Sequence, residues 1–180
     1  MKKRALPIVA ALALVLPATA AAELPAGAQA PLFSTQGAKA GKAISFSLQA
    51  ALARGPVVLY FYPKAFTKGC TLETRAFAEA HDEFAAAGAT VMGMSADDLD
   101  TLKRFSTEEC RDKFAVGVAT PSIIKAYDVE LKHGSLPVGL SDRTSYVIGQ
   151  DGKIAFVHSD LDYRDHVKLT LEKVKALQKK

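Results

Sequence analysis

Apolar and polar residues follow two periods along this chain, and the two periods alternate. A continuous apolar run at 57–62 is typical of a central strand that is covered on both faces of a sheet, and the mostly apolar run at 89–95 predicts the next strand. The stretch after each run repeats its apolar residues at helical spacing. This spacing predicts one helix over about 71–87 and a second that begins near Asp98 and ends near Cys110. Strands that alternate with helices in this way predict an α/β fold.

Shorter elements complete the prediction. They are strands over 44–48, 114–118, 144–148 and 154–158, a helical turn through Arg54, and helices over 121–127 and 165–178. We expect a loosely structured lead-in over 23–42 and an irregular excursion over 129–142. Asp151-Gly152 is a strong hairpin signal between the last two strands. This order matches the thioredoxin arrangement, a thioredoxin-like α/β fold with a central mixed β-sheet flanked by helices.

The N-terminus has the pattern of a secretory signal peptide. Three basic residues at positions 2–4 precede an apolar stretch over 5–16, and small residues follow over 17–22. An uncleaved membrane anchor is the alternative, but the apolar stretch is short for crossing a bilayer. We therefore expect cleavage after Ala20 or Ala22, a signal peptide over 1–22, a single domain over 23–180, and export to the periplasm.

Charge and composition exclude several classes of partner. The full chain has 23 basic and 19 acidic residues and a formal charge of +4; without residues 1–22, which hold three basic residues, 20 basic residues remain against 19 acidic ones. A net charge of +1 gives no reason to expect nucleic acid or stable membrane association after cleavage. The four histidines show no ligand spacing, so we expect neither a metal nor a bound cofactor.

Cys70 is the strongest candidate for chemistry. It lies where a buried strand passes into a helix, and the unpartnered N–H groups and dipole of a helix N-terminus favour an anion. A thiol there is biased toward the reactive thiolate. Thr67, three residues upstream, can aim a hydroxyl at the same point. We expect a nucleophilic sulfur that is negatively charged and within reach of solvent, with Cys110 as the only other cysteine.

The sequence around Cys70 resembles the active-site loop of the peroxiredoxin family. The family pattern is proline, three residues, threonine or serine, two residues, then the peroxidatic cysteine, and residues 62–73 read YPKAFTKGCTLE. The GAQAPLF run over 27–33 and the RTSYVI and DGKI runs over 143–148 and 151–154 also resemble family segments. The resemblance is closest to the bacterioferritin-comigratory (Q-type) branch and extends from about Gly27 to the C-terminus.

The resemblance implies a role for each matching residue. Cys70 would be the peroxidatic nucleophile. Thr67 would hydrogen-bond the peroxide and orient the thiolate, and Arg143 would lie beside the sulfur. Pro63 would shield the pocket, and Glu73 would help to hold the arginine. The implied activity is reduction of hydrogen peroxide and small organic hydroperoxides through a cysteine sulfenic acid.

The resolving cysteine departs from the commonest Q-type pattern. Many members place it five residues after the peroxidatic cysteine, where this chain has Arg75. Other members place it near the end of the next helix, so the resemblance makes Cys110 the candidate. It further implies a thioredoxin-like or other thiol reductant, and we expect a monomer or weak dimer.

Two other functions remain open at this point. A thiol-disulfide oxidoreductase usually needs Cys-x-x-Cys, whereas Thr67 and Glu73 stand three residues before and after Cys70. A non-enzymatic exported protein would instead use Cys70 and Cys110 as a structural disulfide. Peroxide consumption with a thiol reductant separates the first function from both alternatives.

Overall fold

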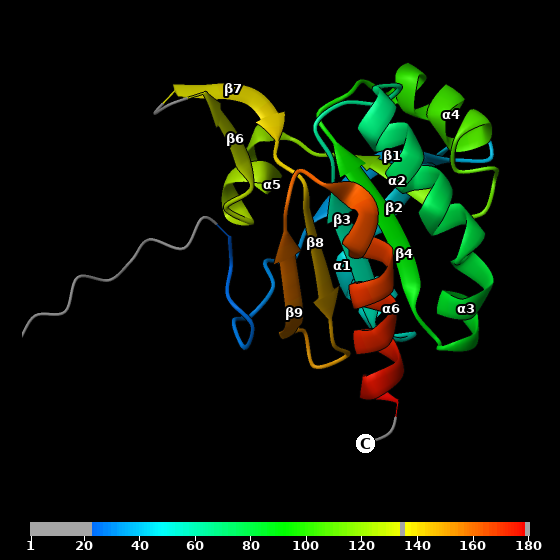
Figure 1. Ribbon diagram of the computed structural model, residues 1–180, viewed down its shortest axis with the longest axis vertical. Helices are drawn as coiled ribbons and strands as arrows, with labels where there is room; N and C mark the ends of the chain where they lie inside the picture. The colour runs from blue at the N-terminus through cyan, green and yellow to red at the C-terminus, as the bar shows by residue number, and fades with distance from the viewer. Residues whose placement is uncertain (1–22, 134–135, 179–180) are drawn as a thin grey trace, which may run out of the picture.

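The computed structural model describes residues 23–133 and 136–178, so the expected signal peptide lies outside the described residues. A seven-stranded mixed sheet forms the centre, in the order β2-β1-β5-β4-β3-β8-β9 (Figure 1). Strand β3 runs parallel to β4, and β4 to β5, whereas β8 is antiparallel to β3. The strands are β1 (Ser34–Lys39), β2 (Lys42–Ser47), β3 (Val57–Phe61), β4 (Thr90–Ser95), β5 (Ala115–Val118), β8 (Thr144–Ile148) and β9 (Ile154–Ser159).

Helices cover both faces of this sheet and define two hydrophobic layers. One layer lies under α2, α3, α4 and α6, and the other under α1 and α5 (Figure 1). The bounds are α1 (Leu48–Leu52), α2 (Lys68–Glu79), α3 (His81–Ala86), α4 (Leu99–Glu108), α5 (Pro121–Ala126), a 3-10 turn η1 (Tyr163–Asp165) and α6 (His166–Leu177). The predicted thioredoxin-like α/β fold is confirmed.

Strand β3 shows why a continuous apolar run was the strongest fold signal. Val57, Leu59 and Phe61 enter the layer under α1 and α5, whereas Val58 and Tyr60 enter the layer under α2 and α4. Side chains of a strand alternate between faces, so a strand buried on both faces must be apolar at every position. All five residues are fully buried.

Two stretches predicted to be irregular contain strands. The expected lead-in over 23–42 includes β1, which pairs with both β2 and β5. Its sequence STQGAK lacks apolar alternation. A Cβ on Gly37 would lie 2.4 Å from the carbonyl oxygen of Val116, so only glycine permits the approach of β1 to β5 at this position. The expected excursion over 129–142 contains the antiparallel pair β6 (Glu130–His133) and β7 (Leu136–Ser141).

The first long helix also differs from its prediction. It begins at Lys68 instead of Thr71, and it divides at Ala80 into α2 and α3. Ala80 has a ψ of −1°, which turns the chain between the two helices. Because the helix starts earlier, Cys70 is its third residue instead of the residue before it. Within the described residues, no helix has the length and apolarity needed to cross a membrane.

Strand order brings together the segments that carry the expected chemistry. The loop 62–67 leaves the end of β3, and Arg143 stands immediately before β8. Strands β3 and β8 are paired so that Phe61 lies opposite Thr144. Arg143 therefore enters the sheet beside the point where the chain leaves β3 for α2.

Candidate active site

Cys70 lies in the first turn of α2, and its side chain is only 1% exposed. The first intrahelical hydrogen bond of α2 runs from the Thr71 N–H to the Thr67 carbonyl. The backbone N–H groups of residues 68–70 therefore have no acceptor within the helix. They provide the positive end of the helix dipole near the sulfur. The expectation of a sulfur within reach of solvent is wrong for this conformation, because Cys70 is buried in a hydrophobic cluster with apolar residues of α2, α4 and β3.

Arg143 supplies a cation to the buried sulfur. Its guanidinium Nη2 donates to the Sγ of Cys70 at 3.5 Å, Nη1 donates to the Oε2 of Glu73, and Nε donates to the Leu161 carbonyl at 2.9 Å. The side chain is itself buried. Because each nitrogen has an acceptor, the guanidinium plane is held in one orientation, and an attractive charge faces the thiolate form.

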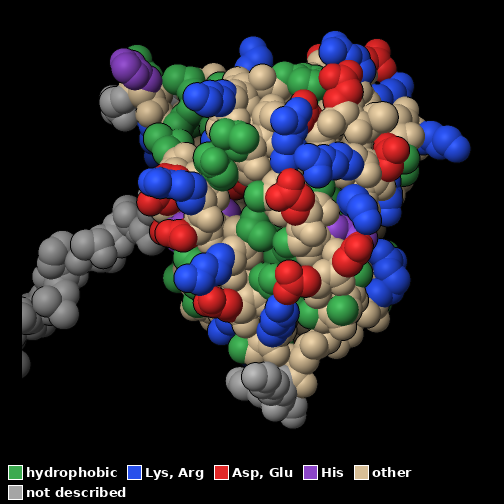
Figure 2. All heavy atoms as spheres, turned by 45° about the vertical axis from the view of Figure 1, so that its right-hand side comes forward, with side chains coloured by type: hydrophobic (Ala, Val, Ile, Leu, Met, Phe, Trp, Pro, Cys, Tyr) green, Lys and Arg blue, Asp and Glu red, His purple; other side chains and the backbone are tan. Residues whose placement is uncertain are grey.

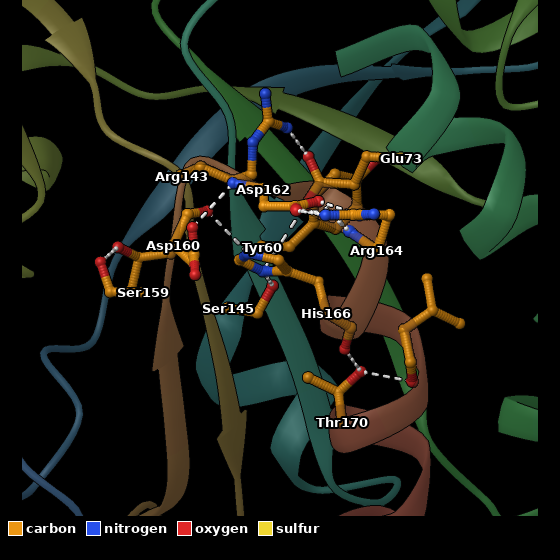
Figure 3. Close-up of polar contacts among 12 residues, drawn as sticks. Tyr60, Glu73, Arg143, Ser145, Ser159, Asp160, Asp162, Arg164, His166 and Thr170 are labelled. Atoms are coloured by element: carbon orange, nitrogen blue, oxygen red, sulfur yellow. Dashed lines mark hydrogen bonds and ion pairs between the residues drawn. The ribbon is translucent and has the colours of Figure 1, made fainter. Parts of the chain in front are cut away.

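Glu73 lies on the same face of α2 as Cys70, nearly one turn later, and is fully buried. Burial raises the pKa of its carboxyl to about 8, against the opposing effect of Arg143. Its Oε1 has no hydrogen-bond partner in the described structure. Figure 3 shows Glu73 in a dense group of polar side chains with Arg143, His166 and Ser145.

Gly69 is a site residue that the sequence analysis missed. A Cβ at this position would lie 3.1 Å from the Nη2 of Arg143. That distance is tighter than ordinary van der Waals contact, so the guanidinium would have to shift by a few tenths of an ångström to admit a larger residue. The signal in the sequence was the glycine directly before the candidate cysteine.

Thr67 occupies the N-cap position of α2, but its side chain makes no capping bond. Its hydroxyl donates to the Lys64 carbonyl at 2.9 Å. The hydroxyl hydrogen is therefore committed within the loop and does not point at the sulfur in this conformation. Thr67 is exposed and Pro63 is half-buried, and their expected roles toward a peroxide stay predictions.

Asp97 and Phe66 hold the loop before α2, and neither was expected to do so. The Ala65 N–H donates to the Oδ2 of Asp97 at 2.7 Å, which links this loop to the end of β4. Phe66 adopts a left-handed φ of 64°, and its ring packs edge-on against Phe105 of α4 at 5.1 Å. Because parallel strands end at one edge of a sheet, an acidic residue after β4 could have been a signal.

Cys110 follows the end of α4 and is fully buried as a free thiol. Burial, with added repulsion from Glu109 and Asp112, raises the pKa of this thiol far above its usual range. Cys70 is also a free thiol, in the same hydrophobic cluster as Cys110. The described conformation therefore contains no Cys70–Cys110 disulfide, and its second thiol is neutral and inert.

Among the described residues, no group of three or more histidine, cysteine or acidic side chains has an arrangement suited to a metal ion. Three groups surround the Cys70 sulfur: a helix N-terminus, a buried guanidinium and a neighbouring carboxyl group. These groups stabilise a thiolate and negative charge that develops next to it. Fold and site together define a cysteine-dependent enzyme of the thioredoxin-like class.

The chain belongs to the AhpC/TSA family, whose model matches residues 26–157. It is 31% identical to Peroxiredoxin Bcp of Escherichia coli (strain K12) over 122 residues, 66% of this chain and 78% of the relative. It is 29% identical to Peroxiredoxin Bcp of Bacillus subtilis (strain 168) over 127 residues, 69% of this chain and 80% of the relative.

Solved structures agree with this assignment. Peroxidoxin BcpB from Mycobacterium tuberculosis is similar with a TM-score of 0.74 and 27% identity, over 84% of this chain and 97% of that one. The predicted membership of the peroxiredoxin family, in its Q-type branch, is confirmed.

Proposed function

We propose that this protein is a thiol-dependent peroxidase in which Cys70 attacks the O–O bond of hydrogen peroxide or a small organic hydroperoxide. The observation that carries the proposal is the position of the Cys70 sulfur, in the first turn of α2 and 3.5 Å from the Nη2 of a buried arginine. Membership of the AhpC/TSA family supports it.

The first step is a two-electron oxidation of sulfur. The thiolate forms an S–O bond with one peroxide oxygen, and the O–O bond breaks. The electron pair leaves with the other oxygen, which takes up a proton and departs as water or an alcohol. Cys70 is then a sulfenic acid.

Thiolate formation alone explains little of the rate. A thiol with a pKa of about 8.5 is a few per cent ionised at neutral pH, so full ionisation would raise the reaction rate roughly 30-fold. That factor corresponds to about 2 kcal/mol. Larger contributions come from donors that face the oxygens as charge moves onto the leaving one. The Arg143 guanidinium and the N–H groups at the start of α2 are the donors nearest the sulfur.

We further propose that Cys110 resolves the sulfenic acid. Its sulfur would displace the hydroxyl of Cys70, so that an S–S bond forms and water leaves. A thioredoxin-like dithiol would then reduce the disulfide. Cys110 is buried and neutral in the described conformation, so the step requires local opening. Arg111 and Asp112, directly after it, both have left-handed φ angles, of 49° and 59°, which favours opening at this segment.

Peroxide consumption in the presence of a thiol reductant tests the function. The wild type should consume peroxide, and Cys70→Ser should not. Mass spectrometry after one equivalent of peroxide should find a Cys70–Cys110 disulfide in the wild type and a sulfenic acid in Cys110→Ser. Consumption by Cys70→Ser would reject the peroxidase proposal. A free Cys110 beside an oxidised Cys70 would reject resolution by Cys110 and indicate a cycle with one cysteine.

We also propose that the protein is exported to the periplasm after loss of residues 1–22, and that it is a monomer or weak dimer. The basic and apolar pattern of residues 1–22 supports export. The face shown in Figure 2 intersperses acidic and basic side chains. The sequence obtained by N-terminal sequencing of periplasmic protein should begin after Ala20 or Ala22.

Light scattering of the reduced and the oxidised protein tests the oligomeric state. A stable ring-shaped oligomer would contradict a monomer or weak dimer.

A further inference from the structure

His166 is a buried histidine to which the sequence analysis assigned no function. It opens α6 and is fully buried. Its Nδ1 lies 2.8 Å from the hydroxyl oxygen of Ser145 and 3.6 Å from the Oε1 of Glu73, and its Nε2 lies 2.9 Å from the carbonyl oxygen of Asp160. Figure 3 shows these side chains converging from α2, β8 and α6.

The contact with Asp160 determines where the imidazole carries its proton. A backbone carbonyl only accepts hydrogen bonds, so the Nε2 of His166 must be the donor in that 2.9 Å contact. In a neutral imidazole, Nδ1 then presents a lone pair to its neighbours. The Ser145 hydroxyl donates to that lone pair at 2.8 Å, and the Oε1 of Glu73 faces the same nitrogen at 3.6 Å, beyond hydrogen-bond distance.

The Oε1 of Glu73 is a buried oxygen with no hydrogen-bond partner among the described residues. If Glu73 were ionised, an uncompensated carboxylate oxygen would face a nitrogen lone pair at 3.6 Å, and two acceptors would repel each other. A proton on the carboxyl removes this repulsion, because the neutral acid carries no net charge at the contact. Burial raises the pKa of Glu73 to about 8 and lowers the pKa of His166 to about 4, which places the proton on the carboxyl.

The location of this proton affects the sulfur through Arg143. The guanidinium contacts both the Oε2 of Glu73 and the Sγ of Cys70. If Glu73 and Cys70 were both ionised, two buried anions would share one cation, and uncompensated charge is costly in a buried site. If Glu73 is neutral, the charge of Arg143 is matched by the thiolate alone.

We infer that His166 is a positioning residue of this site: it offers the Oε1 of Glu73 no hydrogen-bond donor, keeps that carboxyl neutral, and so leaves the charge of Arg143 to the Cys70 thiolate. The inference rests on the proposed function, because it gives His166 a role in preparing the peroxidatic sulfur. It adds a residue and a protonation state that the resemblance did not supply.

Other charged or titratable groups face His166 and must be considered in any pH measurement. Glu73 reaches it from α2, and Arg143 from the start of β8. His158 of β9 contacts its ring at 4.5 Å between centroids. Asp160 and Asp162 lie in the segment that leads to α6, and each interacts electrostatically with it. The experiment therefore compares variants at Glu73 and His166 in one background, so that the remaining groups stay constant.

The test measures the pKa of the Cys70 thiol from the pH dependence of its alkylation by iodoacetamide, in a Cys110→Ser background. His166→Asn replaces the acceptor with an amide that can donate to Glu73, which favours the ionised carboxyl. We expect the thiol pKa to rise by about one unit, and alkylation at neutral pH to slow about tenfold. In a Glu73→Gln background, the same His166 substitution should leave the thiol pKa unchanged. His133→Asn, at an exposed position on β6, is the matched control and should have no effect.

Equal shifts in the two backgrounds, or no shift in either, would overturn the role of His166. Nuclear magnetic resonance of the imidazole nitrogens in the unsubstituted protein provides a second readout that does not depend on a variant folding. It should show a neutral ring with the proton on Nε2 at neutral pH, and a doubly protonated ring would overturn the inference. Alkylation requires no peroxide, so a failure of the peroxidase proposal would leave both measurements interpretable.

Discussion

Replacement of Glu73 by glutamine should change how the stability of the protein depends on pH. The carboxyl has an ordinary pKa of 4.5, which burial raises to about 8 in the folded protein. Between these values the folded state keeps a proton that the unfolded state has released. The stability that this group provides is complete below pH 4.5 and is lost as the pH rises toward 8. Glutamine has the shape of the neutral acid and does not titrate, so the loss should be absent from Glu73→Gln.

The magnitude follows from the proton difference. One proton bound only in the folded state changes the free energy of unfolding by about 1.4 kcal/mol per pH unit. From about pH 5.5 to about pH 7.5, the stability of Glu73→Gln relative to wild type should therefore rise by about 2 to 3 kcal/mol. Urea unfolding of the reduced proteins at a series of pH values measures this difference.

The control is Glu79→Gln on the same helix, where the side chain is 66% exposed. Its stability relative to wild type should be nearly independent of pH over the same range. A flat difference for Glu73→Gln would refute the reasoning, because it would mean that Glu73 enters the folded state as the ionised partner of Arg143. A difference that falls as pH rises would refute it as well.

The remaining predictions concern the reaction. Arg143→Ala and Thr67→Val should lose more peroxidase rate than their change in thiolate fraction explains, with about 100-fold expected for the arginine; losses that equal the thiolate change would contradict this. Gly69→Ala should displace the guanidinium, raise the pKa of the peroxidatic thiol and slow peroxide reduction by about tenfold, as stopped-flow kinetics can measure; an unchanged rate would show that the arginine tolerates the added methyl group. Arg75→Ala removes a bond of 2.6 Å to Glu109 at the end of α4. This ion pair ties α2 to the residue next to Cys110, and a pair of this kind contributes about 1 kcal/mol or less. Without it the segment should open more easily, so disulfide formation should accelerate by up to about fivefold. Slower formation would contradict a route through local opening.

Local patterns in the sequence were sufficient for the main elements and for the reactive cysteine. The apolar run of β3 required a strand buried on both faces, and the change to helical spacing from Thr71 onward placed Cys70 at a helix start. These conclusions depend on residues close together in the chain. Prediction was poorest at β1, whose polar sequence forms a strand because two neighbouring strands supply its hydrogen bonds, and at α2, whose first turn contains no apolar repeat.

Tertiary structure decided what surrounds the sulfur. Arg143 is 73 residues from Cys70 in the chain, and only the pairing of β3 with β8 brings its guanidinium to the helix start. His166 reaches Glu73 because α6 packs against α2 and β8. The protonation of such groups depends on burial and on neighbours from other elements, and a pattern of spacing contains neither. The sequence therefore identified the candidate sulfur, whereas the packing of distant segments determined which charged groups surround that sulfur and how little solvent reaches it.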